Sequence, residues 1–126
     1  MNSAEEAGGT AFGISGSVQR MDASVLEQLA EILTEIGEWV RKSSGTFLGH
    51  VKMAISSANG DMTLNLTDLK RGVDHHGAIA LPADVKVRLM AAVLDVSHDE
   101  LAVTAQNALK KVNFKADKKG KIIELR

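Results

Sequence analysis

The chain has 126 residues, of which 44% are hydrophobic and 25% charged, with a formal net charge of −1 and no cysteine. The missing thiols exclude a disulfide framework, thiolate zinc sites, iron–sulfur ligation and cysteine nucleophiles, and a chain of this length can bury a core without them. No apolar run approaches the roughly 18 residues of a membrane span, and the 3% aromatic content argues against stacking on single-stranded nucleic acid, so we expect a soluble cytoplasmic protein.

The first 21 residues are rich in Gly, Ser and Ala and show no sustained apolar period. Such a segment gains little from folding to offset the lost backbone entropy. We therefore predict a disordered lead over residues 1–21 and a single domain over residues 22–126.

A helix is predicted between Asp22 and Gly45. Ser24 and Glu27 have the spacing of a capping box, Asp22 is an alternative cap, and Gly45 ends the helix. Seven apolar residues fall on one stripe of a 3.6-residue period: Val25, Leu29, Ile32, Leu33, Ile36, Trp39 and Val40.

Two alternating runs follow, over residues 47–55 and 62–67, and each places apolar side chains on one face. Asn59-Gly60 lies between them, and both residues tolerate the positive φ of a type I′ turn. The pattern predicts a two-stranded antiparallel ribbon with one apolar face.

Residues 68–84 read as turn and loop with a short edge strand around 78–81. Residues 85–96 then alternate between apolar and polar side chains in their first half and are apolar on both faces in their second half. This favours a long, partly central strand, although the residue types also allow a helix, which stays the alternative.

A second helix is predicted to begin at Ser97, which forms a capping box with Glu100. Its apolar stripe consists of Leu101, Ala105, Ala108, Leu109 and Val112. Residues 121–126 could add a last short strand. The order of elements indicates an α+β fold, a mainly antiparallel sheet of three to five strands with two amphipathic helices packed on one face.

The four histidines are the candidate metal ligands. His75 and His76 lie in the predicted loop, and folding could bring His98 or His50 to them, to make a Zn²⁺ or Ni²⁺ site of N/O type. Adjacent residues on an extended backbone point in opposite directions, so His75 and His76 would not normally face one ion together. The competing interpretation, which we prefer, is four exposed histidines without a ligand.

A polar patch on the exposed side of the ribbon is the candidate partner surface. His50 and Lys52 lie two residues apart and therefore share a face, opposite the apolar side chains. The returning strand adds Thr63, Asn65 and Thr67. An ordinary solvated sheet face is the competing interpretation.

Charge is divided along the chain. Residues 1–40 contain seven acids and one base, whereas residues 110–126 contain seven bases and two acids. The Lys-rich end could attract phosphates or an acidic protein. Phe114 is the one aromatic residue there and Arg126 the one arginine, so we do not expect a nucleic-acid partner.

Four short runs resemble one known family. Gly49-His50-Val51-Lys52, Asn59-Gly60, Leu64-Asn65-Leu66-Thr67 and the run from Val96 to Leu101 are similar to the C-terminal accessory domain of CobW-type metallochaperone GTPases. The resemblance spans roughly residues 22–112 and implies a small α+β unit that takes part in protein contacts. The chain lacks the phosphate-loop and guanine-reading motifs of that family's GTPase domain, so GTP hydrolysis is not implied.

No nucleophile, base and orienting group come together in the sequence. We therefore predict a non-enzymatic accessory or protein-interaction domain without a cofactor, with a protein partner and with self-association through an uncovered sheet face or edge as a further option. The alternative is a small metal- or ligand-binding protein that uses the histidines. An enzyme would require a deep pocket holding His50 with an acid such as Asp68 or Asp74.

Overall fold

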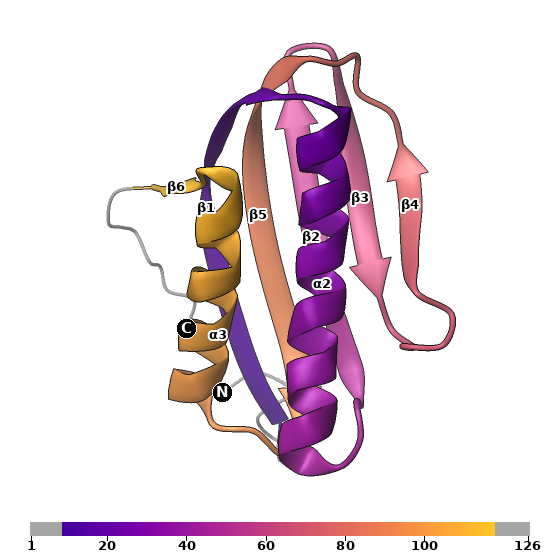
Figure 1. The fold of residues 1–126 in the computed structure, drawn as a ribbon, viewed down its shortest axis with the longest axis vertical. Helices are drawn as coiled ribbons and strands as arrows, with labels where there is room; N and C mark the ends of the chain where they lie inside the picture. The colour runs from indigo at the N-terminus through magenta and orange to yellow at the C-terminus, as the bar shows by residue number, and fades with distance from the viewer. Residues whose placement is uncertain (1–8, 118–126) are drawn as a thin grey trace.

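A computed structural model describes residues 9–117. Figure 1 shows the chain order of its elements. They are β1 (Gly9–Met21), α2 (Ala23–Ser44), β2 (Gly49–Ser57), β3 (Gly60–Leu66), β4 (Val73–Gly77), β5 (Ala83–Leu94), α3 (His98–Leu109), a 3₁₀ turn (Lys110–Val112) and β6 (Lys115–Ala116).

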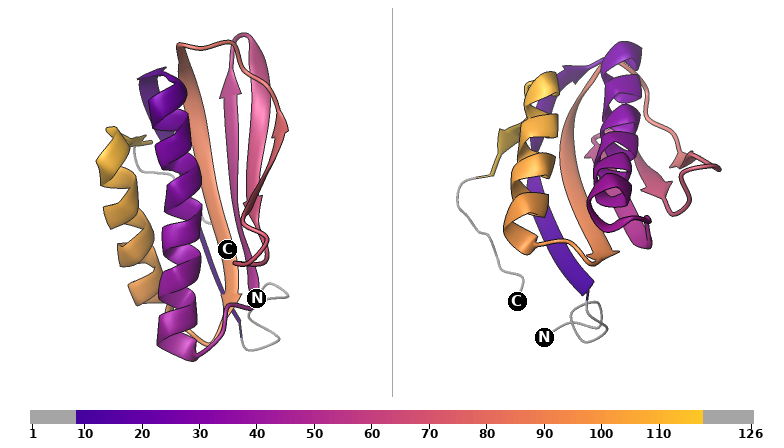
Figure 2. Two further views of the ribbon diagram at one scale, coloured as in Figure 1. Left: turned by 45° about the vertical axis from the view of Figure 1, so that its right-hand side comes forward. Right: turned by 60° about the horizontal axis from the view of Figure 1, so that its bottom comes forward.

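The strands form one six-stranded sheet in the order β4-β3-β2-β5-β1-β6, and every neighbouring pair is antiparallel. Both helices lie on the same side of this sheet, α2 over its middle and α3 beside α2 and over β1 (Figure 2). The α+β class and the two-helix layer predicted from sequence are confirmed. The sheet has six strands, whereas the sequence predicted three to five.

The strand β1 corrects the prediction of a disordered lead for residues 9–21; residues 1–8 lie outside the described residues. β1 pairs with β5 from Gly9↔Leu94 to Val18↔Val85. Its ladder of hydrogen bonds joins segments about 80 residues apart, a gain that no local pattern reveals. Apolar residues and glycine nevertheless recur at every second position of this segment. These residues are Phe12, Ile14, Gly16 and Val18, and all four lie on the helix side of the sheet.

The edge strand also lies elsewhere than predicted. β4 occupies Val73–Gly77 and not 78–81, so His75 and His76 belong to a strand and not to a loop. The strand assignment for 85–96 is confirmed over Ala83–Leu94, where β5 lies between β2 and β1. The short strand predicted over 121–126 lies outside the described residues.

Two local details differ from the sequence interpretation. Asp22, and not Ser24, caps α2, because its Oδ1 accepts a hydrogen bond of 2.9 Å from the backbone N–H of Val25. The hairpin forms as predicted, but its two loop residues are Ala58 and Asn59, and Gly60 with φ +142° already pairs with Ser57. A Cβ at Gly60 would lie 2.5 Å from the Ala78 carbonyl oxygen, which explains the glycine.

The core lies between the helix layer and the sheet. α2 contributes a stripe of buried side chains, β2, β3 and β5 contribute alternate residues, and α3 contributes Leu101, Ala105, Ala108 and Leu109. The stripe of α2 is Leu29, Ile32, Leu33, Ile36 and Val40. Residues one position away on the strands face the opposite side of the sheet, which no described element covers.

Candidate functional site: the uncovered sheet face

The side of the sheet away from the helices is not covered by any element within residues 9–117 (Figure 2). Residues directly opposite each other on antiparallel strands share a face, so the register assigns its members. They are Ala11, Ser15 and Ser17 of β1, His50, Lys52, Ala54 and Ser56 of β2, Asp61, Thr63 and Asn65 of β3, Asp74 and His76 of β4, and Lys86, Arg88, Met90, Ala92 and Leu94 of β5.

Three cations lie on the two central strands of this face. Lys52 lies opposite Met90, and Arg88 lies opposite Ala54, so Lys52 is the diagonal neighbour of Arg88. Lys86 lies on the same strand as Arg88, two residues earlier in the sequence. All three side chains are exposed, and none takes part in an ion pair with another described residue. We call Lys52, Lys86 and Arg88 the basic patch.

The acids of the same face lie beside this patch. Asp74, on the edge strand, forms an ion pair of 3.4 Å with Arg71, which compensates its charge. Asp61 lies opposite Ser56, and Ser56 lies opposite Lys86, so a whole strand separates the two charges. The centre of the face therefore carries a positive charge that the described residues do not neutralise.

The other end of the face carries mainly apolar side chains. Met90, Ala92 and Leu94 are half-buried on β5, and Ala11 lies opposite Ala92 on β1. Leu48, just before β2, is a large hydrophobic side chain with 51% of its surface exposed. A cationic half and an apolar half thus adjoin on one sheet surface.

The residues predicted to face a partner divide into two groups. His50 and Lys52 are exposed and Thr63 and Asn65 half-buried on the uncovered face, whereas Thr67 lies just beyond β3. The sequence interpretation missed Lys86 and Arg88, the two cations of β5. The alternation over residues 85–94 assigns both to the side opposite Val85, Val87 and Leu89, and this signal could have found them.

The histidines do not converge. His50 and His76 lie on the uncovered face, but two strand spacings and four residues separate them, roughly 16 Å at standard sheet dimensions. His75 shares the opposite face with Leu64, and the His98 ring lies against Phe12 with a centroid separation of 6.0 Å. Within residues 9–117 no group of three His, Cys, Asp or Glu residues could hold a metal ion.

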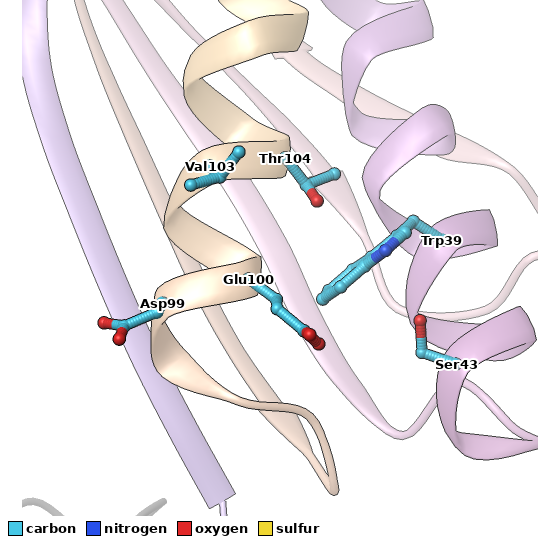
Figure 3. Close-up of a pocket in the computed structure, with 6 residues that line it drawn as sticks. All are labelled: Trp39, Ser43, Asp99, Glu100, Val103 and Thr104. Atoms are coloured by element: carbon cyan, nitrogen blue, oxygen red, sulfur yellow. The ribbon is translucent and has the colours of Figure 1, made fainter.

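A groove lies on the helix layer. The C-terminal half of α2 and the first turns of α3 enclose an open groove of about 560 Å³, lined by Trp39, Ser43, Asp99, Glu100, Val103 and Thr104 (Figure 3). Glu100 and Trp39 reach toward each other across it, whereas Asp99 points outward. The groove brings Glu100 and the indole ring of Trp39 together, but its lining has no histidine to act as a base for Ser43 or Thr104.

Charge is divided between the layers as well as along the chain. α2 presents Glu27, Glu31 and Glu35 to solvent, and Lys111 reaches Glu35 with a contact of 2.6 Å. The sheet side presents the basic patch. The two broad surfaces of the domain therefore differ in sign near their centres.

No family model, curated protein or solved structure matches this chain. None of the helices formed by residues 9–117 has both the length and the apolar composition needed to cross a membrane.

Proposed function

We propose that the chain is a non-enzymatic interaction domain whose uncovered sheet face binds an acidic segment of a protein partner. The observation that carries the proposal is the basic patch, three exposed and unpaired cations on adjacent central strands of a face that no described element covers. Carboxylates of a partner would supply the missing countercharge.

The apolar half of the face favours a protein over a nucleic acid. Met90, Ala92 and Leu94 offer contacts to aliphatic side chains next to the cations. Phosphate backbones need extended basic surfaces, whereas the basic patch consists of three residues on two strands. Among the described residues, the uncovered face also carries no Phe, Tyr or Trp side chain on which bases could stack.

The resemblance to the accessory domain of CobW-type GTPases adds a candidate context to this proposal. Gly49, His50 and Lys52 belong to the first of the resembling runs and lie at the start of β2, where Lys52 is itself part of the basic patch. A purified GTPase of that type, mixed with the chain, should form a stoichiometric complex that the basic-patch variant described below does not form.

Titration with a synthetic oligoglutamate peptide, followed by ¹H–¹⁵N NMR, tests the acidic-partner proposal. Lys52, Asn65, Lys86 and Arg88 should show the largest shifts, and the triple variant Lys52→Gln/Lys86→Gln/Arg88→Gln should lose binding. The matched control Arg41→Gln/Lys42→Gln/Lys110→Gln removes the same charges from the helix layer and should bind like the unmodified chain. Added salt should weaken binding, because exposed charges are screened within about 8–10 Å.

Oligothymidylate serves as the competing probe. Tighter binding of oligothymidylate than of oligoglutamate would replace the protein partner by a nucleic acid. Equal loss of peptide binding in the two triple variants would show that only net charge matters, and would reject the sheet face as the site.

A further inference from the structure

Within residues 9–117, the outer edge of β1 has backbone hydrogen-bonding groups from Gly9 to Gly13 that no described strand pairs with. Among residues 9–117, β6 pairs with this edge only at Gly16 and Ser17, and the Asp117 N–H adds one hydrogen bond of 2.9 Å to the Ser15 carbonyl. Successive strand residues alternate the direction of their backbone groups. The backbone carbonyl of Ser15 points toward the outer edge of the sheet, so the backbone N–H and C=O groups of Gly13, Ala11 and Gly9 point the same way.

Between Gly9 and Gly13 this edge lacks, among the described residues, several of the usual features that prevent pairing. No charged residue and no proline occurs between Gly9 and Gln19, and the irregularity in the ladder comes only after Val18. The opposite edge strand, β4, is five residues long and carries Asp74, His75 and His76. The short length and the polar side chains of β4 therefore oppose strand addition at that edge, whereas β1 has neither feature from Gly9 to Gly13.

Phe12 and Ile14 lie half-buried on the helix side of the edge strand, so an added strand would cover their remaining surface. On the other side of the strand, Ala11 and Gly13 are small residues. The unpaired backbone groups of β1 and the half-buried side chains of Phe12 and Ile14 could therefore both be covered by one more antiparallel strand.

We infer that the added strand is β1 of a second copy of this chain, antiparallel, with Ala11 opposite Ala11 of the other copy. In this register Gly9 lies opposite Gly13, so each outward residue from Gly9 to Gly13 meets an outward residue, and none of these positions pairs with β6 among the described residues. The segment has no charge, so two identical copies do not repel each other. A two-fold axis relates the copies, as in most homodimers.

The same register continues the apolar half of the sheet face across the interface. Ala92 lies opposite Ala11 within one chain, and the pairing would extend this row through the second Ala11 to the second Ala92. Two six-stranded sheets would become one. This inference is independent of the acidic partner proposed above, because the edge of β1 and the basic patch share no residue.

Light scattering after gel filtration should give a mass of twice 13.4 kDa for the unmodified chain. Ala11→Lys should give a monomer with an unchanged circular dichroism spectrum, because its side chain points to solvent on the uncovered face. A chain that stays monomeric at its highest soluble concentration would overturn the inference, and so would a dimer that survives Ala11→Lys.

Cysteine crosslinking tests the register and does not depend on how the lysine variant folds. The chain has no cysteine, so Ala11→Cys introduces one thiol per copy, opposite its counterpart at a Cα separation of about 5.5 Å that a disulfide can span. Ser15→Cys, on the same face, would place its thiols roughly 26 Å apart. Rapid oxidation of Ala11→Cys alone supports the inference; no crosslink, or equal crosslinking of the two variants, overturns it.

Discussion

Gly16 shows how one residue decides where a strand can be added. A Cβ at this position would lie 2.3 Å from the Lys115 carbonyl oxygen and 2.4 Å from Cζ of Phe114. The backbone of β6 and the Phe114 ring therefore approach β1 more closely than any side chain would permit. A glycine in a strand often marks such an approach, which the sequence alone could not attribute to a partner about 100 residues away.

Gly16→Ala should lower the free energy of unfolding by about 1–3 kcal/mol, the usual cost of forcing an atom into a packed site. Urea denaturation followed by circular dichroism measures this change. Ser15→Ala is the control, since its side chain lies on the uncovered face, and it should change stability by less than about 0.5 kcal/mol. An equally small effect of Gly16→Ala would mean that β6 is not seated on β1.

At the scale of the element, the start of α2 separates local propensity from geometry. Ser24 and Glu27 match a capping box, yet the chain enters the helix two residues earlier, where the Asp22 carboxylate accepts the Val25 N–H. The choice follows from β1, whose last residue, Met21, is fully buried and fixes where the turn into the helix begins. The gap between strand and helix is therefore a single residue.

Asp22→Ala should cost about 1 kcal/mol of stability, the typical value of an N-cap. Ser24→Ala should change stability by less than about 0.5 kcal/mol, because the hydroxyl caps nothing in this structure. Thermal unfolding of both variants distinguishes the two caps. A larger loss for Ser24→Ala than for Asp22→Ala would restore the capping box.

The central strand β5 alternates between buried and exposed side chains along its length. Leu89 is fully buried between Met53 of β2 and Ile14 of β1, whereas the preceding residue, Arg88, is exposed. Leu89→Ala should therefore destabilise the chain by about 2–5 kcal/mol, and Arg88→Ala by less than about 0.5 kcal/mol. Chemical denaturation provides both values. Similar losses for the two variants would contradict the assignment of the faces.

At the scale of the whole molecule, helices and sheet share one core. The inner stripe of α2 packs on the buried side chains of β2 and β3, and α3 packs on β1 and α2. The four ion pairs among the described residues all involve side chains that are at least about one third exposed. Such pairs add little to stability, so the common apolar core decides how the domain unfolds.

Unfolding should therefore be a single cooperative transition. Trp39, the one tryptophan of the chain, lies on α2 and reports on the helix layer through its fluorescence, whereas far-ultraviolet circular dichroism reports on all elements. The two midpoints in urea should coincide. A fluorescence transition that precedes the dichroism change would show that the helix layer unfolds separately and that the single-domain prediction is wrong.

Sequence periodicity by itself determined both helices, the hairpin, β5 and the polar character of the hairpin's outer face. These features depend on which residues recur with periods of 3.6 or 2. Leu29, Ile36, Val51 and Leu89 follow those periods because one side of each helix or strand must be buried away from water. His50 and Lys52 were placed on the outer face by the same rule.

Only the tertiary structure decided the rest. The strand β1 exists because its backbone pairs with β5, and β4 lies at 73–77 because it pairs with β3. The separation of His50, His76 and His98 follows from strand order, which no local pattern contains. Pairing partners, sheet edges and the grouping of Lys52 with Arg88 are relations between distant segments, and their free energy appears only when the whole sheet has formed.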